Sequence, residues 1–188
     1  MRAITFTLCL CLLFTQAYAG PFGTEMCDKP EKFGKTFNDL SPERGIRVTP
    51  PKQHSTFTIY ELRFADDGLA SVTALSDYYK RDRFASGAKS DYATLKKQLT
   101  EKYGQPQITE YLKSGGIYDK DSEFAASLYY KERFHFATWS NNLPDNLIEI
   151  TLGIMGASSD SVILGLVYKY KNHPNLEKSK EKIQQDAL

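Results

Sequence analysis

Three strand-like segments follow one another near the end of the chain, and they constrain its fold more than any other feature. They are Arg133–Trp139, residues 147–154 and residues 162–170, and all are rich in β-branched and aromatic residues. The links between them, residues 141–146 and 156–160, are polar and of hairpin length. Strands joined by such short links run antiparallel. This part of the chain is therefore predicted to form a three-strand antiparallel meander.

A second hairpin is predicted earlier in the sequence. Residues 56–64 alternate between two faces, Asp66-Asp67-Gly68 is a typical turn, and residues 69–75 return as a second strand. Two shorter strands are expected at residues 46–49 and 108–112. These segments indicate an antiparallel sheet made of an N-terminal hairpin and the C-terminal meander.

Helices are predicted between and before the strands. The clearest begins at Ser90 or Asp91 and ends before Gly104, because its apolar residues recur at helical spacing. Weaker patterns favour a helix at residues 28–40 and another at 122–131. The fold class is therefore α+β, an antiparallel sheet with two or three helices packed on one face.

The first 19 residues have the features of a cleavable secretory signal peptide. Arg2 supplies the positive charge, residues 3–14 are apolar and uncharged, and Ala17-Tyr18-Ala19 places small residues where a signal peptidase cuts. The apolar run is too short to span a bilayer, which needs roughly 20 residues. We therefore expect a periplasmic or secreted protein with one domain at residues 20–172 and a polar C-terminal tail at 173–188. No stable membrane insertion is expected after cleavage.

Cleavage changes the composition that matters for function. Removing Arg2 leaves 23 of the 24 basic residues against 23 acidic ones, a balance that gives no field to attract nucleic acid. It also removes two of the three cysteines and leaves Cys27 as a free thiol, so no internal disulfide can form. A buried, inert thiol is the simpler interpretation of Cys27, and an intermolecular disulfide is the alternative.

Several short patterns occur in a fixed order along the mature chain. They are His54-x-x-Phe57, Gly68-Leu69-x-x-Val72, Leu95-x-x-x-Leu99-x-x-Lys102-Tyr103-Gly104-x-Pro106, Glu132-Arg133, Trp139, Leu147-Ile148-x-Ile150 and a closing Tyr-rich strand ending at Asn172. In this order the chain resembles a group of uncharacterised secreted proteins of Gram-negative bacteria, and the likeness covers most of the mature chain. The resemblance implies a periplasmic location and brings no known activity and no catalytic residues.

Patterns that suggest catalysis or metal binding are each better explained by structure. Ser86-x-x-Lys89 fits the motif of serine acylases, but this chain is too short for the spacing that those folds need. Asp119-x-Asp121-x-Glu123 resembles the start of a calcium loop, yet Phe124 and Tyr130 stand where that loop needs Gly and Glu. The three histidines, His54, His135 and His173, lie on separate elements without ligand spacing. We therefore expect no metal and no cofactor.

The best candidate contact surface is the loop between the first hairpin and the main helix. It alternates aromatic and basic residues, and its expected contact residues are Tyr78, Tyr79, Arg81, Arg83 and Phe84. Aromatic-rich loops often carry binding, although a solvated loop is the simpler alternative. The sequence favours a non-enzymatic protein that binds another envelope or periplasmic protein, as an accessory factor, inhibitor or immunity protein. The alternative is a periplasmic hydrolase whose scattered site includes Asp119, Asp121, Glu123 and His135.

Export gives the first testable prediction. The Ala-x-Ala site places the cut after Ala19, so the exported protein should begin at or near Gly20. The intact mass of the protein recovered from the periplasm or medium measures this directly. An unprocessed chain held in the inner membrane would contradict it.

Overall fold

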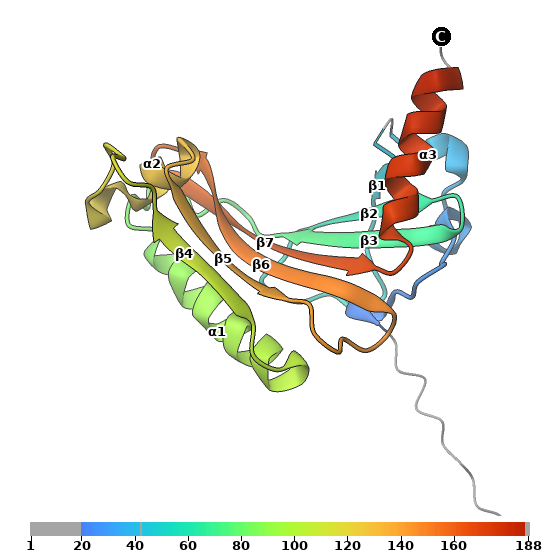
Figure 1. Cartoon of the computed structure of the whole chain (residues 1–188), viewed down its shortest axis with the longest axis horizontal. Helices are drawn as coiled ribbons and strands as arrows, with labels where there is room; N and C mark the ends of the chain where they lie inside the picture. The colour runs from blue at the N-terminus through green and yellow to red at the C-terminus, as the bar shows by residue number, and fades with distance from the viewer. Residues whose placement is uncertain (1–19, 42, 187–188) are drawn as a thin grey trace, which may run out of the picture.

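One seven-stranded antiparallel sheet organises the molecule (Figure 1). The computed structural model describes residues 20–41 and 43–186, so the predicted signal peptide lies outside the described residues. The order of strands across the sheet is β1-β2-β3-β7-β6-β5-β4, and each neighbouring pair is antiparallel. The strands are β1 (Gly45–Arg47), β2 (Ile59–Ala65), β3 (Gly68–Leu75), β4 (Gln107–Leu112), β5 (Arg133–Trp139), β6 (Leu147–Ser158) and β7 (Ser161–Tyr170).

The predicted hairpin and meander become one sheet because β3 pairs with β7. The register runs from Ser71 opposite Lys169 to Leu75 opposite Gly165. The α+β class with an antiparallel sheet is confirmed, and the sheet is open at both edges, β1 and β4.

In the described part of the chain, three α-helices and four short 3₁₀ turns accompany the sheet. They are α1 (Ser86–Tyr103), α2 (Phe124–Tyr129), α3 (His173–Asp186), η1 (Pro21–Gly23), η2 (Pro30–Phe33), η3 (Phe37–Asp39) and η4 (Asp121–Glu123). Helix α1 starts earlier than predicted, because Ala85 adopts a left-handed conformation before it and Asp82 accepts the N–H of Gly87. The predicted helix at residues 28–40 is instead two 3₁₀ turns, since Gly34 has a φ of 69° and ends the first.

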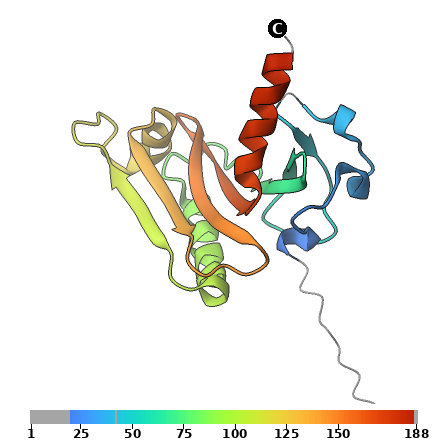
Figure 2. The same cartoon turned by 45° about the vertical axis from the view of Figure 1, so that its right-hand side comes forward.

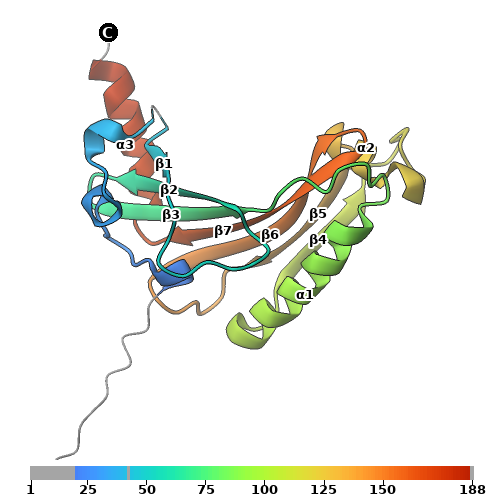
Figure 3. The same cartoon turned by 180° about the vertical axis from the view of Figure 1, so that it is seen from behind.

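The main core lies on the face of the sheet that α1 and α2 cover (Figure 3). Helix α1 buries Tyr92, Leu95 and Leu99 there, at the helical spacing that the sequence indicated. The indole N–H of Trp139 donates to the carbonyl of Gly104 at 2.8 Å, which ties β5 to the end of α1. Helix α2 lies directly against β6, where a Cβ on Gly156 would collide with the backbone of Tyr129.

The polar C-terminal segment forms a helix that packs on the sheet, a contact that its composition did not predict. Residues 173–186 form α3, which packs on β2 and β3 across the other side of the sheet from α1 (Figures 1 and 2). Leu176 is only 1% exposed and contacts Ala65 and Ala70 in a small second core. Lys180 forms an ion pair with Glu43 at 3.0 Å. Leu176 and Ser179 are the buried residues of the described part of this helix, and most of its other described side chains are exposed.

Helix α3 should therefore contribute to stability. Replacing Leu176 with Ala removes the apolar side chain from the second core and should cost about 2 kcal/mol of unfolding free energy, at the low end for a buried leucine. For a chain of this size this corresponds to a melting temperature lower by about 5 °C. Lys178→Ala, an exposed change on the same helix, is the control and should leave the melting temperature nearly unchanged. Thermal unfolding measures both, and equal behaviour of the two variants would show that α3 does not stabilise the sheet.

Candidate functional site

The open face of the sheet is the most distinctive surface of the molecule. Successive strand residues point to opposite faces, so the neighbours of the core residues on β6 and β7 point away from α1. In the middle of the sheet, no helix of the described residues covers this face (Figure 1). Its residues on β6 and β7 are nevertheless mostly apolar or small: Thr151, Gly153, Met155, Ile163, Gly165 and Val167.

A hollow of about 220 Å³ lies in the open face where two glycines meet. Gly153 on β6 pairs directly with Gly165 on β7, so two adjacent positions carry no side chain. Phe136, Met155 and Val167 form the walls around them. A Cβ on Gly165 would lie 2.6 Å from the end of the Met155 side chain, so methionine lies over this glycine. The hollow is apolar, and one of its walls is the flexible side chain of Met155.

A second hollow of about 280 Å³ continues the first one toward α2. Phe134 and Met155 line it together with Tyr129, and Lys131 and Arg133 add positive charge. Beyond Phe134, Tyr111 of β4 stacks on its ring with centroids 5.0 Å apart. The aromatic surface therefore extends from the centre of the sheet to its edge.

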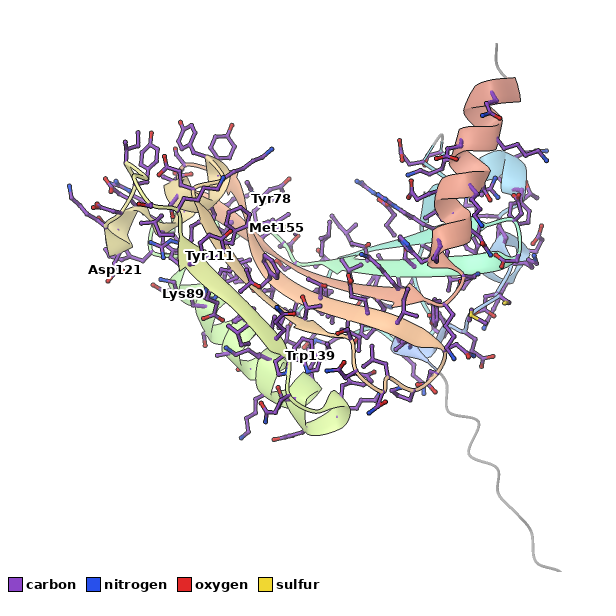
Figure 4. The ribbon with its side chains drawn as sticks, in the orientation of Figure 1. Tyr78, Lys89, Tyr111, Asp121, Trp139 and Met155 are labelled. Carbon is purple, nitrogen blue, oxygen red and sulfur yellow. The ribbon has the colours of Figure 1, made fainter. Side chains whose placement is uncertain are left out.

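Tyr78 extends this surface on the β7 side, away from Tyr111 on β4. Tyr79 forms an isolated antiparallel bridge with Val162, whose side chain is in the main core. The Tyr79 hydroxyl donates to the carboxylate of Asp91 on α1, and burial, with this hydrogen bond, raises the Tyr79 pKa. The preceding residue, Tyr78, points the other way and is 59% exposed. Figure 4 labels Tyr78 and Met155 at the same end of the sheet.

The loop predicted as a contact surface is thus divided between two roles. Tyr79 is a structural residue that packs against the core, whereas Tyr78 belongs to the open face. Arg81 and Arg83 are exposed, and the carbonyl of Arg83 accepts the N–H of Ala125 at the start of α2. Phe84 is 51% exposed just before α1. The sequence contains one signal for the rest of the site. On β5, β6 and β7 the residues that point to either face include apolar ones, whereas a sheet covered on one face needs apolar residues on that face only.

The residues of the hydrolase alternative come from two places in the chain, the turn before α2 and strand β5. His135 points to the α1 side, with its ring 4.7 Å from that of Tyr92 and its Nε2 3.9 Å from Glu110. Asp119 and Asp121 are exposed, and Glu123 accepts the N–H of Lys120 in the turn η4. The carboxylate nearest His135 is therefore Glu110, which the sequence did not single out. Within residues 20–41 and 43–186, no group of three or more His, Cys, Asp or Glu residues could hold a metal ion.

Burial sets the electrostatics around His135. It lowers the pKa of His135, and the nearby cations Lys96 and Lys89 act in the same direction, against the attraction of Glu110. Burial alone would raise the pKa of Glu110, but a hydrogen bond from Tyr92 and the charges of His135 and Lys96 outweigh it and lower that pKa. The group is a packed polar cluster below α1.

Cys27 differs from its predicted buried state. Its thiol is exposed, and its φ of 70° places it in a turn. A Cβ on Gly68 would collide with the backbone of Cys27, so the two turns lie in direct contact. Close backbone packing at this position leaves the thiol pointing outward.

The lowered pKa of His135 predicts a pH dependence. A histidine whose pKa is below 6.5 in the folded protein stays neutral there, so the unfolded chain binds more protons as the pH falls below 6.5. Stability should therefore be complete above about pH 6.5 and decline as the pH falls toward the folded pKa. The half-buried His173 contributes in the same direction. Thermal unfolding between about pH 5 and 8 should give a shallower slope for His135→Gln than for the wild type. Identical slopes would contradict a packed, neutral His135.

Within the described part of the chain, no helix is long and apolar enough to cross a membrane. Comparisons with protein-family models, with curated proteins and with solved structures found no match to this chain.

Proposed function

We propose that this is a periplasmic or secreted, non-enzymatic protein that binds another envelope protein through the open face of its sheet. The observation that carries the proposal is the uncovered apolar face with its two-glycine hollow. Large exposed apolar side chains gather around it: Tyr78 (59%), Tyr111 (50%), Tyr129 (46%) and Met155 (43%). Contiguous apolar surface of this kind is typical of interaction sites.

The surface also indicates the chemistry of the partner. The hollow between Gly153 and Gly165 would receive one apolar side chain of the partner, with Met155 adjusting over it. Tyr78 and Tyr111 at its two ends offer rigid rings that lose little entropy on binding. Lys113, whose Nζ lies 5.2 Å from the Phe134 ring, and Lys131 place positive charge beside the aromatic surface. The partner is therefore a protein segment with exposed apolar residues flanked by acidic ones.

The periplasmic location is part of the proposal and rests on residues 1–19 and on the resemblance described above. Binding is favoured over hydrolysis because Asp119 and Asp121 are exposed, while the two apolar hollows adjoin and share Phe136 and Met155. The contact residues proposed from the sequence are retained in part, with Tyr78 as the one on the open face.

Met155 offers the sharpest test of the binding surface. Met155→Glu places a charge beside the hollow and in front of the proposed acidic partner, so it should weaken capture of the partner about tenfold or more. Ile148→Glu is the matched control, because Ile148 is on the same strand and similarly exposed at 39% but lies outside both hollows. The measurement is photocrosslinking in the periplasm from a benzophenone side chain at position 78, with identification of the crosslinked peptide.

A single crosslinked protein, joined through an apolar and acidic segment and lost in Met155→Glu but not in Ile148→Glu, is the expected result. Equal crosslinking in the two variants would place the interface elsewhere. Turnover of a peptidoglycan, phosphoester or ester substrate that is lost in Asp121→Ala would replace binding with the hydrolase alternative.

A further inference from the structure

A polar hollow of about 180 Å³ lies beside the first described residue. Its lining residues are Gly20, Glu25, Met26, Asp145 and Asn146. The turn η1 and the loop between β5 and β6 lie side by side around it (Figure 2). Two segments more than a hundred residues apart in the sequence thus enclose a site lined by two carboxylates.

One of these carboxylates lacks a partner. Within residues 20–41 and 43–186, no hydrogen-bond donor reaches the Oδ2 atom of Asp145, although this atom is buried. A buried, unpartnered carboxylate oxygen is costly, because the water it has lost is not replaced. Asp145 is held in this place by a left-handed backbone conformation with a φ of 57°.

Gly20 is fixed in the same hollow. It is buried, and its carbonyl accepts the N–H of Gly23 at 3.0 Å. A Cβ at this position would collide with the carbonyl oxygen of Thr24 and approach the hydroxyl of Tyr170 to 3.2 Å. The Tyr170 hydroxyl is itself hydrogen-bonded to Thr24. The backbone of residue 20 is therefore part of the packed fold, and only glycine fits there.

We propose that signal cleavage completes this site, with the new α-ammonium group of Gly20 binding the buried carboxylate of Asp145. The inference rests on the proposed export and on a cut after Ala19. Hydrolysis of the Ala19–Gly20 peptide bond by a signal peptidase consumes one water, leaves a carboxylate on Ala19 and gives Gly20 an amine that takes a proton from solvent. The amide nitrogen of the precursor carries no charge, so the ion pair exists only in the mature protein.

The charges around the hollow favour an ammonium group. The carboxylate of Asp28 already accepts the N–H of Glu25 and forms an ion pair with Lys32 at 2.8 Å. The carboxylates of Glu25 and Asp145 remain, and both act on the nearby Tyr170, whose pKa burial raises. Two lysines lie on this side: Lys52, whose stem packs against Gly23, and Lys171, whose backbone N–H donates to the carbonyl of Asn146 at 2.8 Å. An ion pair with Asp145 favours the charged amine, so the α-amino pKa in the folded protein should lie above its ordinary value of about 7.7 to 8.0.

The test compares four proteins that all begin at Gly20, released from a fusion by a protease that leaves this residue first. Two have a free amine and two are N-acetylated, and each pair consists of the wild-type sequence and the Asp145→Asn variant. Asparagine tolerates the left-handed conformation of this position, so the variant should fold. At pH 7 acetylation alone and Asp145→Asn alone should each lower the melting temperature by about 3 °C, and the two together by no more than either. Glu101→Gln, an exposed change, is the control and should lower none of these temperatures.

The pH dependence gives a second readout. Because the amine pKa is raised in the folded state, its stabilisation is complete below about pH 7.5 and is lost as the pH rises through the folded pKa. The difference between free and acetylated protein should therefore vanish by about pH 10. The proposal is overturned if acetylation leaves the melting temperature at pH 7 unchanged, or if Asp145→Asn lowers it equally in acetylated protein. Since these proteins are prepared with Gly20 first, a failure of export or of partner binding is detected separately, by intact mass and by crosslinking.

Discussion

The pairing of β3 with β7 is the contact on which the rest of the structure depends. It joins the N-terminal hairpin to the C-terminal meander through the register from Ser71 opposite Lys169 to Leu75 opposite Gly165. An isolated two-stranded hairpin is marginal in water, and β1 adds only three residues to β2, so the hairpin depends on its pairing with β7. The pairing also brings Val72 and Ala74 into the main core. The long loop that it closes costs conformational entropy, which the burial on both sides of the junction offsets.

The unequal covering of the two faces follows from this sheet. Helices α1 and α2 share one core with the β5, β6 and β7 strands, whereas α3 covers only the β2 and β3 end of the other side. The middle of that second side remains open, and it keeps apolar side chains such as Phe136 and Met155. The proposed binding surface is therefore the part of the sheet that the chain itself leaves without a helix.

The first residues of the proposed mature protein belong to the core. Phe22 packs edge-on against Tyr168 with ring centroids 5.8 Å apart, and Thr24 is hydrogen-bonded to Tyr170 at 3.0 Å. Both tyrosines are on the last strand, so the beginning and the end of the domain hold each other in place. Because the new N-terminus would lie beside this packed region and not in open solvent, its charge would affect the stability of the fold.

The sequence by itself determined the strands and the main helix, because their signals are local. Alternation along β2, the short polar links of the meander and the stripe of Tyr92, Leu95 and Leu99 depend only on neighbouring residues. Composition did not predict that residues 173–186 pack on the sheet, because this contact depends on the burial of Leu176 and Ser179 against distant strands. The candidate site was decided by tertiary structure. Gly153 and Gly165 form a hollow only because the register of β6 and β7 sets them opposite each other, and Tyr78 separates from Tyr79 only through the bridge to Val162. The sequence predicts that these strands pair, but not the exact register or bridge, because a shift of one residue would move each side chain to the other face.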